Sequence, residues 1–204
     1  MAGFEAIVEA FAPIWQGSVL DVGCRSGNFK HALDGYPIEY CGLDTARPAD
    51  VVGTLEVGLP FADMAFNTVV ALDVLEHVDR IHRGISELFR VARNNVIIAL
   101  PNGFDMPVRI KFLLGRRLSA KYGLPLDVPG DRHRWLFSYS EAERFCVQWA
   151  ERQGFKVVHA GSVVGPRRGS IVAKTLVTRF PNAFSPRFVG LMTRKTSVDA
   201  DSPT

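Results

Sequence analysis

The stretch VLDVGCRSGNF at residues 19–29 limits the possible folds of this chain more than any other segment. Its apolar run ends at Asp21, and a turn with Gly23 and Gly27 then leads into a helix-like segment. Glycine adopts positive φ angles without steric cost and lets a ligand approach the backbone, so this pattern is typical of a strand that passes to a helix at a nucleotide site. A second apolar run ends in Asp44, about twenty residues further on, where a carboxylate can hold both hydroxyls of a ribose.

Apolar strands alternate with helical patterns along the rest of the chain. Strands are expected at residues 18–22, 38–44, 50–52, 68–72, 95–100, 155–160 and 171–178. Helices are expected at residues 3–12, 27–33, 81–92 and 140–153, the last with a capping box of Ser140 and Glu143. This alternation predicts a doubly wound, Rossmann-like α/β fold with a seven-stranded, mostly parallel sheet. Because no helix is expected between the last two strands, they predict an antiparallel C-terminal hairpin.

The length of 204 residues suits one domain. We expect that domain to span residues 1–178. Residues 102–139 are rich in Pro, Gly and basic side chains, and they predict an insertion that covers the sheet. Residues 179–204 are expected to form a C-terminal extension, and its last ten residues are polar and predicted to be disordered.

Composition excludes several classes of protein. Hydrophobic residues make up 47% and charged residues 22%, as in a soluble globular protein, and the net charge of +3 indicates no general polyanion partner. No apolar run is long enough to span a bilayer, and no secretory signal pattern opens the chain. Cys24, Cys41 and Cys146 are odd in number and lack metal-ligand spacing, so they predict reduced thiols in a cytoplasmic protein and no metal site.

Five motifs follow one another in a familiar order. They are DVGCRSG (21–27), YCGLD (40–44), GLPFADMAFNTVVALDVLEHV (58–78), NVIIALPNG (95–103), and RHRWLFS with the helix behind it (132–155). With these motifs the chain resembles a class I S-adenosylmethionine-dependent methyltransferase, of the small-molecule, type 11-like branch, over roughly residues 15–178. The resemblance implies an enzyme of class EC 2.1.1 that binds S-adenosyl-L-methionine and methylates an oxygen, nitrogen or carbon atom of a small-molecule acceptor.

Three positions depart from the pattern of that family. Arg25 replaces the middle glycine of the first loop, Thr54 an acidic residue after the third strand, and Asn67 the aspartate of an FD pair. Arg25 suits the site if its side chain points away from the ligand or faces the methionine carboxylate, since guanidinium pairs well with carboxylate. The departures keep open the alternative of a non-catalytic cofactor-binding module with the same fold.

The resemblance places the cofactor between the two acidic turns and the end of the fourth strand. Asp44 would accept hydrogen bonds from the ribose hydroxyls, and Asp73 would line the methionine end. The predicted cofactor-binding residues are Asp21, Gly23, Cys24, Arg25, Gly27, Asp44, Thr45, Leu55, Glu56, Asp73, Val74 and His77.

The acceptor is expected at the end of the insertion, where His133, Arg134 and Trp135 are the predicted contacts. An arginine there suits an anionic acceptor. The segment VRIKFLLGRRL (108–118) mixes apolar and basic residues, which fits an ordinary cover helix or a lid at a membrane surface with a lipid-like acceptor. A sulfonium methyl group is already activated, so no base is required in every case. If the acceptor must lose a proton, His77, His133 and Tyr139 are the catalytic candidates.

Two other enzyme classes fit parts of the pattern. A glycine loop followed by Asp44 also suits a nicotinamide-dependent oxidoreductase, but DVGCRSG lacks GxGxxG spacing. A nucleic-acid methyltransferase is the other alternative. The chain has no Asn-Pro-Pro-aromatic motif after the fourth strand and no appended RNA-binding domain, so no nucleic-acid partner is expected.

Overall fold

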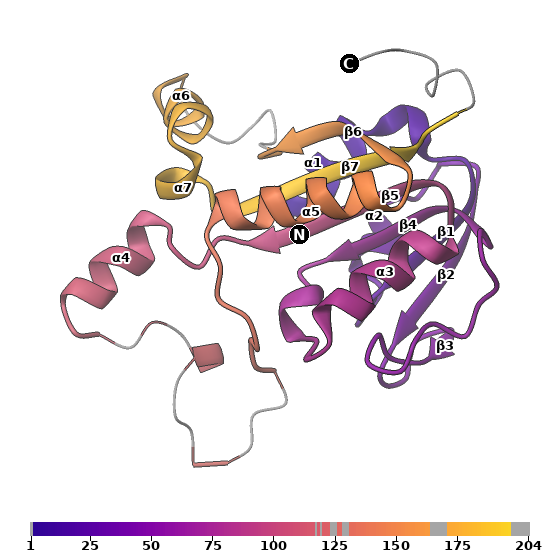
Figure 1. The fold of residues 1–204 in the computed structure, drawn as a ribbon, viewed down its shortest axis with the longest axis horizontal. Coiled ribbons are helices and arrows are strands. Elements are labelled where there is room, and N and C mark those ends of the chain that lie inside the picture. The colour runs from indigo at the N-terminus through magenta and orange to yellow at the C-terminus, as the bar shows by residue number, and fades with distance from the viewer. Residues whose placement is uncertain are drawn as a thin grey trace.

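A twisted seven-stranded sheet in the order β3-β2-β1-β4-β5-β7-β6 forms the centre of the protein (Figure 1). The structure is a computed structural model that describes residues 2–116, 118, 120–122, 126–127, 131–163 and 171–196. The strands are parallel except β7, which runs antiparallel to both of its neighbours. The predicted fold class, a Rossmann-like α/β sheet with an antiparallel C-terminal pair, is therefore confirmed.

The strands are β1 (Gly17–Val22), β2 (Ile38–Asp44), β3 (Val51–Val52), β4 (Phe66–Leu72), β5 (Ala92–Pro101), β6 (Phe155–Gly161) and β7 (Arg187–Arg194). The α-helices are α1 (Ala2–Ala10), α2 (Asn28–Ala32), α3 (Ile81–Val91), α4 (Met106–Leu113), α5 (Tyr139–Arg152), α6 (Ile171–Arg179) and α7 (Pro181–Phe184). Short 3-10 helices are η1 (Ala12–Ile14), η2 (Leu75–His77) and η3 (Ala120–Tyr122).

Helices cover both faces of the sheet. On one face α3 and α5 pack through apolar side chains such as Ile85, Leu88 and Cys146, which are fully buried. On the other face α1 and α2 contribute Ile7 and Phe29 to a second apolar cluster. Because the central strands are buried on both sides, their sequences are continuous apolar runs rather than alternating ones.

The predicted strand at residues 171–178 is wrong, because Ile171–Arg179 forms helix α6 and the seventh strand is β7. β7 lies between β5 and β6, where both faces of a strand are buried, and its FVGLM run carries no charge. Lys174 interrupts the apolar run of residues 171–178. This segment is therefore less suited to a strand position that is buried on both faces. β6 and β7 pair antiparallel as predicted, but α6 and α7 lie between them in sequence.

The capping box of α5 lies two residues before its predicted place. The Glu141 amide donates to the Ser138 hydroxyl at 3.4 Å, and the Ser138 amide donates to the Glu141 carboxylate at 2.8 Å. The segment FSYSEAE holds two overlapping Ser-x-x-Glu pairs, so spacing alone does not choose between them. The earlier pair is favoured because a helix that begins there buries the Tyr139 ring in the core against Phe188.

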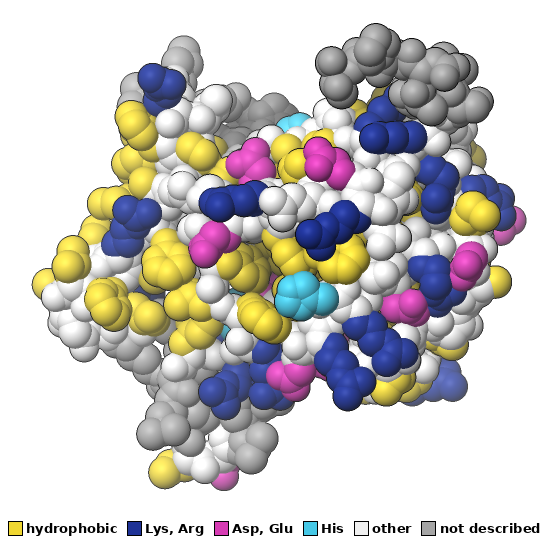
Figure 2. Space-filling model, in the orientation of Figure 1, with side chains coloured by type: hydrophobic (Ala, Val, Ile, Leu, Met, Phe, Trp, Pro, Cys, Tyr) yellow, Lys and Arg dark blue, Asp and Glu magenta, His cyan; other side chains and the backbone are white. Residues whose placement is uncertain are grey.

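The region predicted as an insertion carries α4 and η3 away from the sheet (Figure 1). The side chains of Ile110, Phe112 and Leu113 on α4 are exposed. Figure 2 shows apolar side chains gathered on the side of the molecule where α4, α6 and α7 lie. No helix in the described ranges is long and apolar enough to cross a bilayer. The membrane-surface lid stays a prediction, and its Arg117 lies outside the described residues, as do residues 197–204 of the predicted disordered end.

Candidate functional site

A cavity of about 470 Å³ lies at the carboxyl ends of β1, β2 and β4. The chain crosses from one side of β1 to the other there, because β1 pairs with β2 on one side and with β4 on the other. Ligands of doubly wound sheets bind at such a switch point, and the volume is in the range of small-molecule sites. The predicted residues that line this cavity are Gly23, Arg25, Asp44, Thr45, Leu55, Glu56, Asp73, Val74, His77 and Arg134.

Hydrogen bonds tie the first glycine loop to the end of β2. The Arg25 amide donates to Asp44 Oδ2 at 2.8 Å, and the Thr45 amide donates to Asp44 Oδ1 at 2.6 Å. Gly23 has a φ angle of +79°, and a Cβ atom there would collide with Val74. The loop can therefore lie close against the end of β4 only with glycine at that position. A carboxylate offers about four lone-pair positions, so Asp44 keeps acceptor capacity for a ligand.

Arg25 takes the backbone conformation of the glycine that it replaces. Its φ angle is +46°, in the left-handed region that favours glycine. Its guanidinium lies 3.5 Å from Asp131 Oδ2, beyond the first loop. This departure from the family pattern therefore leaves the shape of the loop intact and adds a contact to the segment that covers the cavity.

Asp21 is buried below the first loop, with 3% of its surface exposed. The Tyr40 hydroxyl donates to its carboxylate at 2.6 Å, and burial raises the pKa of Asp21 to about 6. Asp21 and Cys24 line a neighbouring cavity of about 180 Å³. Burial, with nearby Asp21, also raises the pKa of the Cys24 thiol to about 11, so this thiol is a poor nucleophile near neutral pH.

Asp73 lies between the two cavities and lines both. Its φ angle of +56° is unusual for a residue other than glycine, and such conformations concentrate at functional sites. Its Oδ2 atom lies 3.2 Å from Arg187, whereas Oδ1 is buried without a hydrogen-bond partner among the described residues. Burial raises the pKa of Asp73, and nearby Arg187 opposes this shift. A small rotation of the Asp73 side chain would turn this oxygen toward an ammonium group placed between the cavities.

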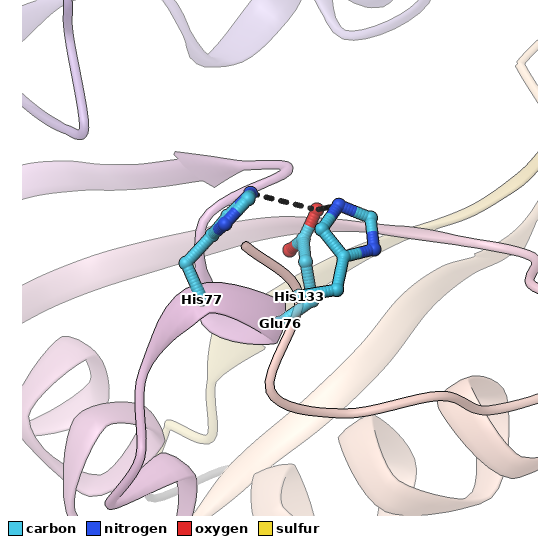
Figure 3. A group of neighbouring side chains, drawn as sticks. All are labelled: Glu76, His77 and His133. Carbon is cyan, nitrogen blue, oxygen red and sulfur yellow. Dashed lines mark ion pairs between the residues drawn. The ribbon is translucent and has the colours of Figure 1, made fainter. Parts of the chain in front are cut away.

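Glu76, His77 and His133 converge beside the main cavity (Figure 3). His77 comes from η2, and His133 comes from the segment before α5. The Nε2 atoms of His77 and His133 lie 3.7 and 3.9 Å from Glu76 Oε1. Burial raises the pKa of Glu76 to about 8 and lowers that of His133 to about 4. Two of the three catalytic candidates are thus neighbours.

Other predicted residues lie elsewhere. The Trp135 indole donates to the Val78 carbonyl at 2.7 Å, and Tyr139 is buried in the core. Gly27, with a φ angle of +75°, is the N-cap of α2. Of the two cavities described, neither is lined by Gly27, His133, Trp135 or Tyr139.

Asp131 is a site residue that the sequence did not indicate. Its carboxylate lies within ion-pair distance of Arg25, His77 and Lys121. These partners come from three segments far apart in the sequence, so no local spacing could reveal them. The other lining residues that were not predicted are Val22, Leu43, Gly53, Thr54, Val78 and Arg132, and most of them adjoin predicted positions.

Asn67, the third departure from the family pattern, lies at the opposite end of the sheet from the cavity. Its side-chain oxygen accepts hydrogen bonds from the amide and the hydroxyl of Ser18, at 3.0 and 2.9 Å. Both residues stand at the start of their strands, whereas ligands bind beyond the strand ends. The substitution therefore leaves the candidate site unchanged.

The comparisons with known proteins agree with this geometry. The chain matches a family described as "Methyltransferase domain" over residues 4–160. A curated protein of Mycobacterium tuberculosis, described as an uncharacterized methyltransferase, is 27% identical over 160 residues, which cover 67% of this chain and 62% of that protein. This chain thus spans less than two thirds of the length of that relative.

Solved structures share the fold at low sequence identity. The magnesium protoporphyrin IX methyltransferase of Synechocystis PCC 6803, solved with SAH bound, has a TM-score of 0.59 and 17% identity over 94% of this chain and 80% of its own. The small RNA methyltransferase HEN1 has a TM-score of 0.63 and 14% identity over 95% of this chain and 25% of its own. The family match, the sheet order and the cavity between the two acidic turns lead to one conclusion: the chain belongs to the class I S-adenosylmethionine-dependent methyltransferases.

Proposed function

We propose that this chain transfers the methyl group of S-adenosylmethionine to a small anionic acceptor by in-line displacement. The observation that carries the proposal is the single cavity in which the first glycine loop, Asp44 and Asp73 meet. When bound, the cofactor supplies an activated methyl group on a sulfonium. The protein then has to position both reactants and exclude water.

The cavity residues fit the parts of the cofactor. Asp44 Oδ2 keeps a lone pair for one ribose hydroxyl, and Oδ1 can accept the second once the Thr45 hydroxyl, which donates to it at 3.1 Å, turns away. The Asp73 carboxylate, whose Oδ1 atom has no hydrogen-bond partner among the described residues, suits the ammonium of the methionine moiety. Leu55 offers an apolar surface to the adenine ring. Thr54 has no carboxylate to offer there, and its hydroxyl accepts a hydrogen bond from the Glu56 amide at 3.2 Å in a local turn.

Arginine side chains gather on the acceptor side of the cavity, and two of them lie within ion-pair distance of carboxylates. Arg25, Arg132 and Arg134 line it together with Asp131. Asp131 is within ion-pair distance of Arg25, and the Arg134 guanidinium lies 3.4 Å from Asp79. Guanidinium groups bind carboxylates and phosphates through paired hydrogen bonds, which favours an anionic acceptor. Exposed apolar side chains on α4 support a lipid-like body for the same molecule.

The proposal is tested by measuring S-adenosylhomocysteine release with three groups of acceptors: small carboxylates and phosphates, lipid-like acids in detergent, and RNA oligonucleotides. Release is expected with a member of the first two groups. Turnover with RNA and with no other acceptor would show that the protein is a nucleic-acid methyltransferase. Tight binding of S-adenosylhomocysteine without turnover in any group would favour a non-catalytic module, and calorimetric binding of NADH instead would contradict the cofactor.

The Arg134→Ala variant is expected to raise KM for an anionic acceptor about tenfold, because a charge-assisted hydrogen bond from this exposed guanidinium to the acceptor is lost. Its Kd for S-adenosylhomocysteine should stay within about twofold of wild type. Arg93→Ala is the matched control, since Arg93 donates to the Met64 carbonyl at the far end of the sheet. A variant that loses cofactor affinity but keeps its acceptor KM would place Arg134 on the cofactor side.

A further inference from the structure

The carboxylate of Glu76 is buried without compensation. Only 1% of its side chain is exposed, and neither oxygen has a hydrogen-bond partner within the described part of the chain. Leaving a buried carboxylate in this state costs several kcal/mol, so such groups are normally paired or bind a metal ion. The arrangement around Glu76 therefore has room for a partner that the described side chains do not supply.

The two histidines point the same ring nitrogen toward this carboxylate. His77 Nδ1 lies 3.0 Å from the Arg132 carbonyl and 3.1 Å from Asp131 Oδ1, and both are acceptors. His133 Nδ1 lies 2.7 Å from the Tyr122 hydroxyl, whose oxygen can accept a hydrogen bond from it. Each Nε2 atom is then left with a lone pair, and both are buried without a hydrogen-bond partner among the described residues. Histidines that bind metals are oriented in this way, through the nitrogen that faces away from the ion.

Hydrogen bonds between these side chains do not explain the cluster. The distances of 3.7 and 3.9 Å from Glu76 Oε1 to the two Nε2 atoms are too long for a hydrogen bond. Ligands of a tetrahedral ion with bonds of about 2.1 Å lie about 3.4 Å apart. The three ligand atoms all lie within 4.8 Å of one another, so small side-chain movements would bring them to that spacing.

We propose that Glu76, His77 and His133 bind a divalent transition-metal ion beside the cofactor cavity. Two imidazoles and one carboxylate favour Zn²⁺, Mn²⁺, Fe²⁺ or Co²⁺ over Mg²⁺, which prefers oxygen ligands. Three protein ligands leave a coordination position open, as in catalytic rather than structural zinc sites.

The open position has a natural occupant if the proposed function holds. His77 belongs to the cluster and also lines the main cavity, so the ion would lie at the edge of the space assigned to the acceptor. An oxygen atom of the acceptor would complete the coordination and would thereby be oriented toward the cofactor. This role rests on the proposed methyl transfer, whereas binding of the ion does not.

The site is tested on protein freed of metal with a chelator and titrated with ZnCl₂ by calorimetry. Co²⁺ binding is followed by its visible d–d absorption, which also reports the coordination geometry. We expect one ion per chain, and an affinity at least about a hundredfold lower in E76Q and in H133N. H31N is the matched control, because His31 lies exposed on α2, and it should bind like wild type.

Folded wild-type protein that binds neither Zn²⁺ nor Co²⁺ at millimolar concentration would overturn the site. Unchanged affinity in both E76Q and H133N, with far-UV circular dichroism like that of wild type, would overturn it as well. The Co²⁺ spectrum of wild type decides the matter even if a variant does not fold. A parallel titration with S-adenosylhomocysteine separates the two proposals. If S-adenosylhomocysteine binds and no metal ion does, only the metal site is contradicted. If a metal ion binds and S-adenosylhomocysteine does not, only the proposed function is contradicted.

Discussion

The Asp44→Ala variant is expected to bind S-adenosylhomocysteine at least about tenfold more weakly than wild type while it remains folded. A carboxylate that accepts hydrogen bonds from two ribose hydroxyls contributes about 1.5–3 kcal/mol for each bond to a charged group. The variant also loses the acceptor of the Arg25 and Thr45 amides, so the first loop is no longer held against the end of β2. Isothermal titration calorimetry measures the change directly.

The matched control for this experiment is Asp34→Ala, which removes an exposed carboxylate next to His31. It should change neither the cofactor affinity nor the circular dichroism spectrum. An unchanged affinity in Asp44→Ala would contradict the ribose role. Loss of the fold in this variant, seen by circular dichroism, would instead show that the tie between the two turns is needed for folding.

The Asp21→Asn variant is expected to become more stable than wild type as the pH rises. Burial raises the pKa of Asp21 from 3.8 to about 6 in the folded protein. The folded state therefore holds this proton more tightly than the unfolded state does. Protonation of Asp21 stabilises folded wild type fully below the unfolded-state pKa, and this stabilisation is lost as the pH rises through about 6. The side-chain amide of asparagine does not titrate, so the variant shows no such loss. Asparagine also keeps an oxygen that can accept the Tyr40 hydroxyl.

The readout is the difference in free energy of unfolding between Asp21→Asn and wild type, measured by urea denaturation from about pH 4 to about pH 8. We expect this difference to shift by about 2–3 kcal/mol in favour of the variant over that interval. Asp34→Asn, at an exposed position, should shift it by less than about 0.5 kcal/mol. A flat difference for Asp21→Asn would mean that the buried carboxylate is charged at no cost, through a compensating contact.

The candidate site could be predicted where its residues follow one another closely in sequence. Gly23 follows β1 directly and Asp44 is the last residue of β2, and in a parallel sheet the ends of such strands meet at one edge. Asp73 and His77 follow β4 in the same way. Strand composition and turn chemistry were therefore enough to bring these positions to one cavity.

Other features depended on contacts between distant segments. The seventh strand is β7 rather than residues 171–178, because the gap between β5 and β6 accepts a strand that is apolar on both faces. The sequence predicted no metal site because its cysteines lack metal-ligand spacing, and Glu76 and His133 lie far apart along the chain. Their convergence, and the ion pairs of Asp131, appear only when the segment before α5 packs over η2.

The sequence by itself predicted the α/β sheet and the two acidic turns, because hydrophobic period and glycine placement act over a few neighbouring residues. Its five motifs indicated the family through their resemblance to it. Only the tertiary structure showed which segment lies between β5 and β6 and which side chains face one another across the acceptor side. Those outcomes depend on burial and on unsatisfied polar groups, which arise only when segments far apart in the chain are packed together.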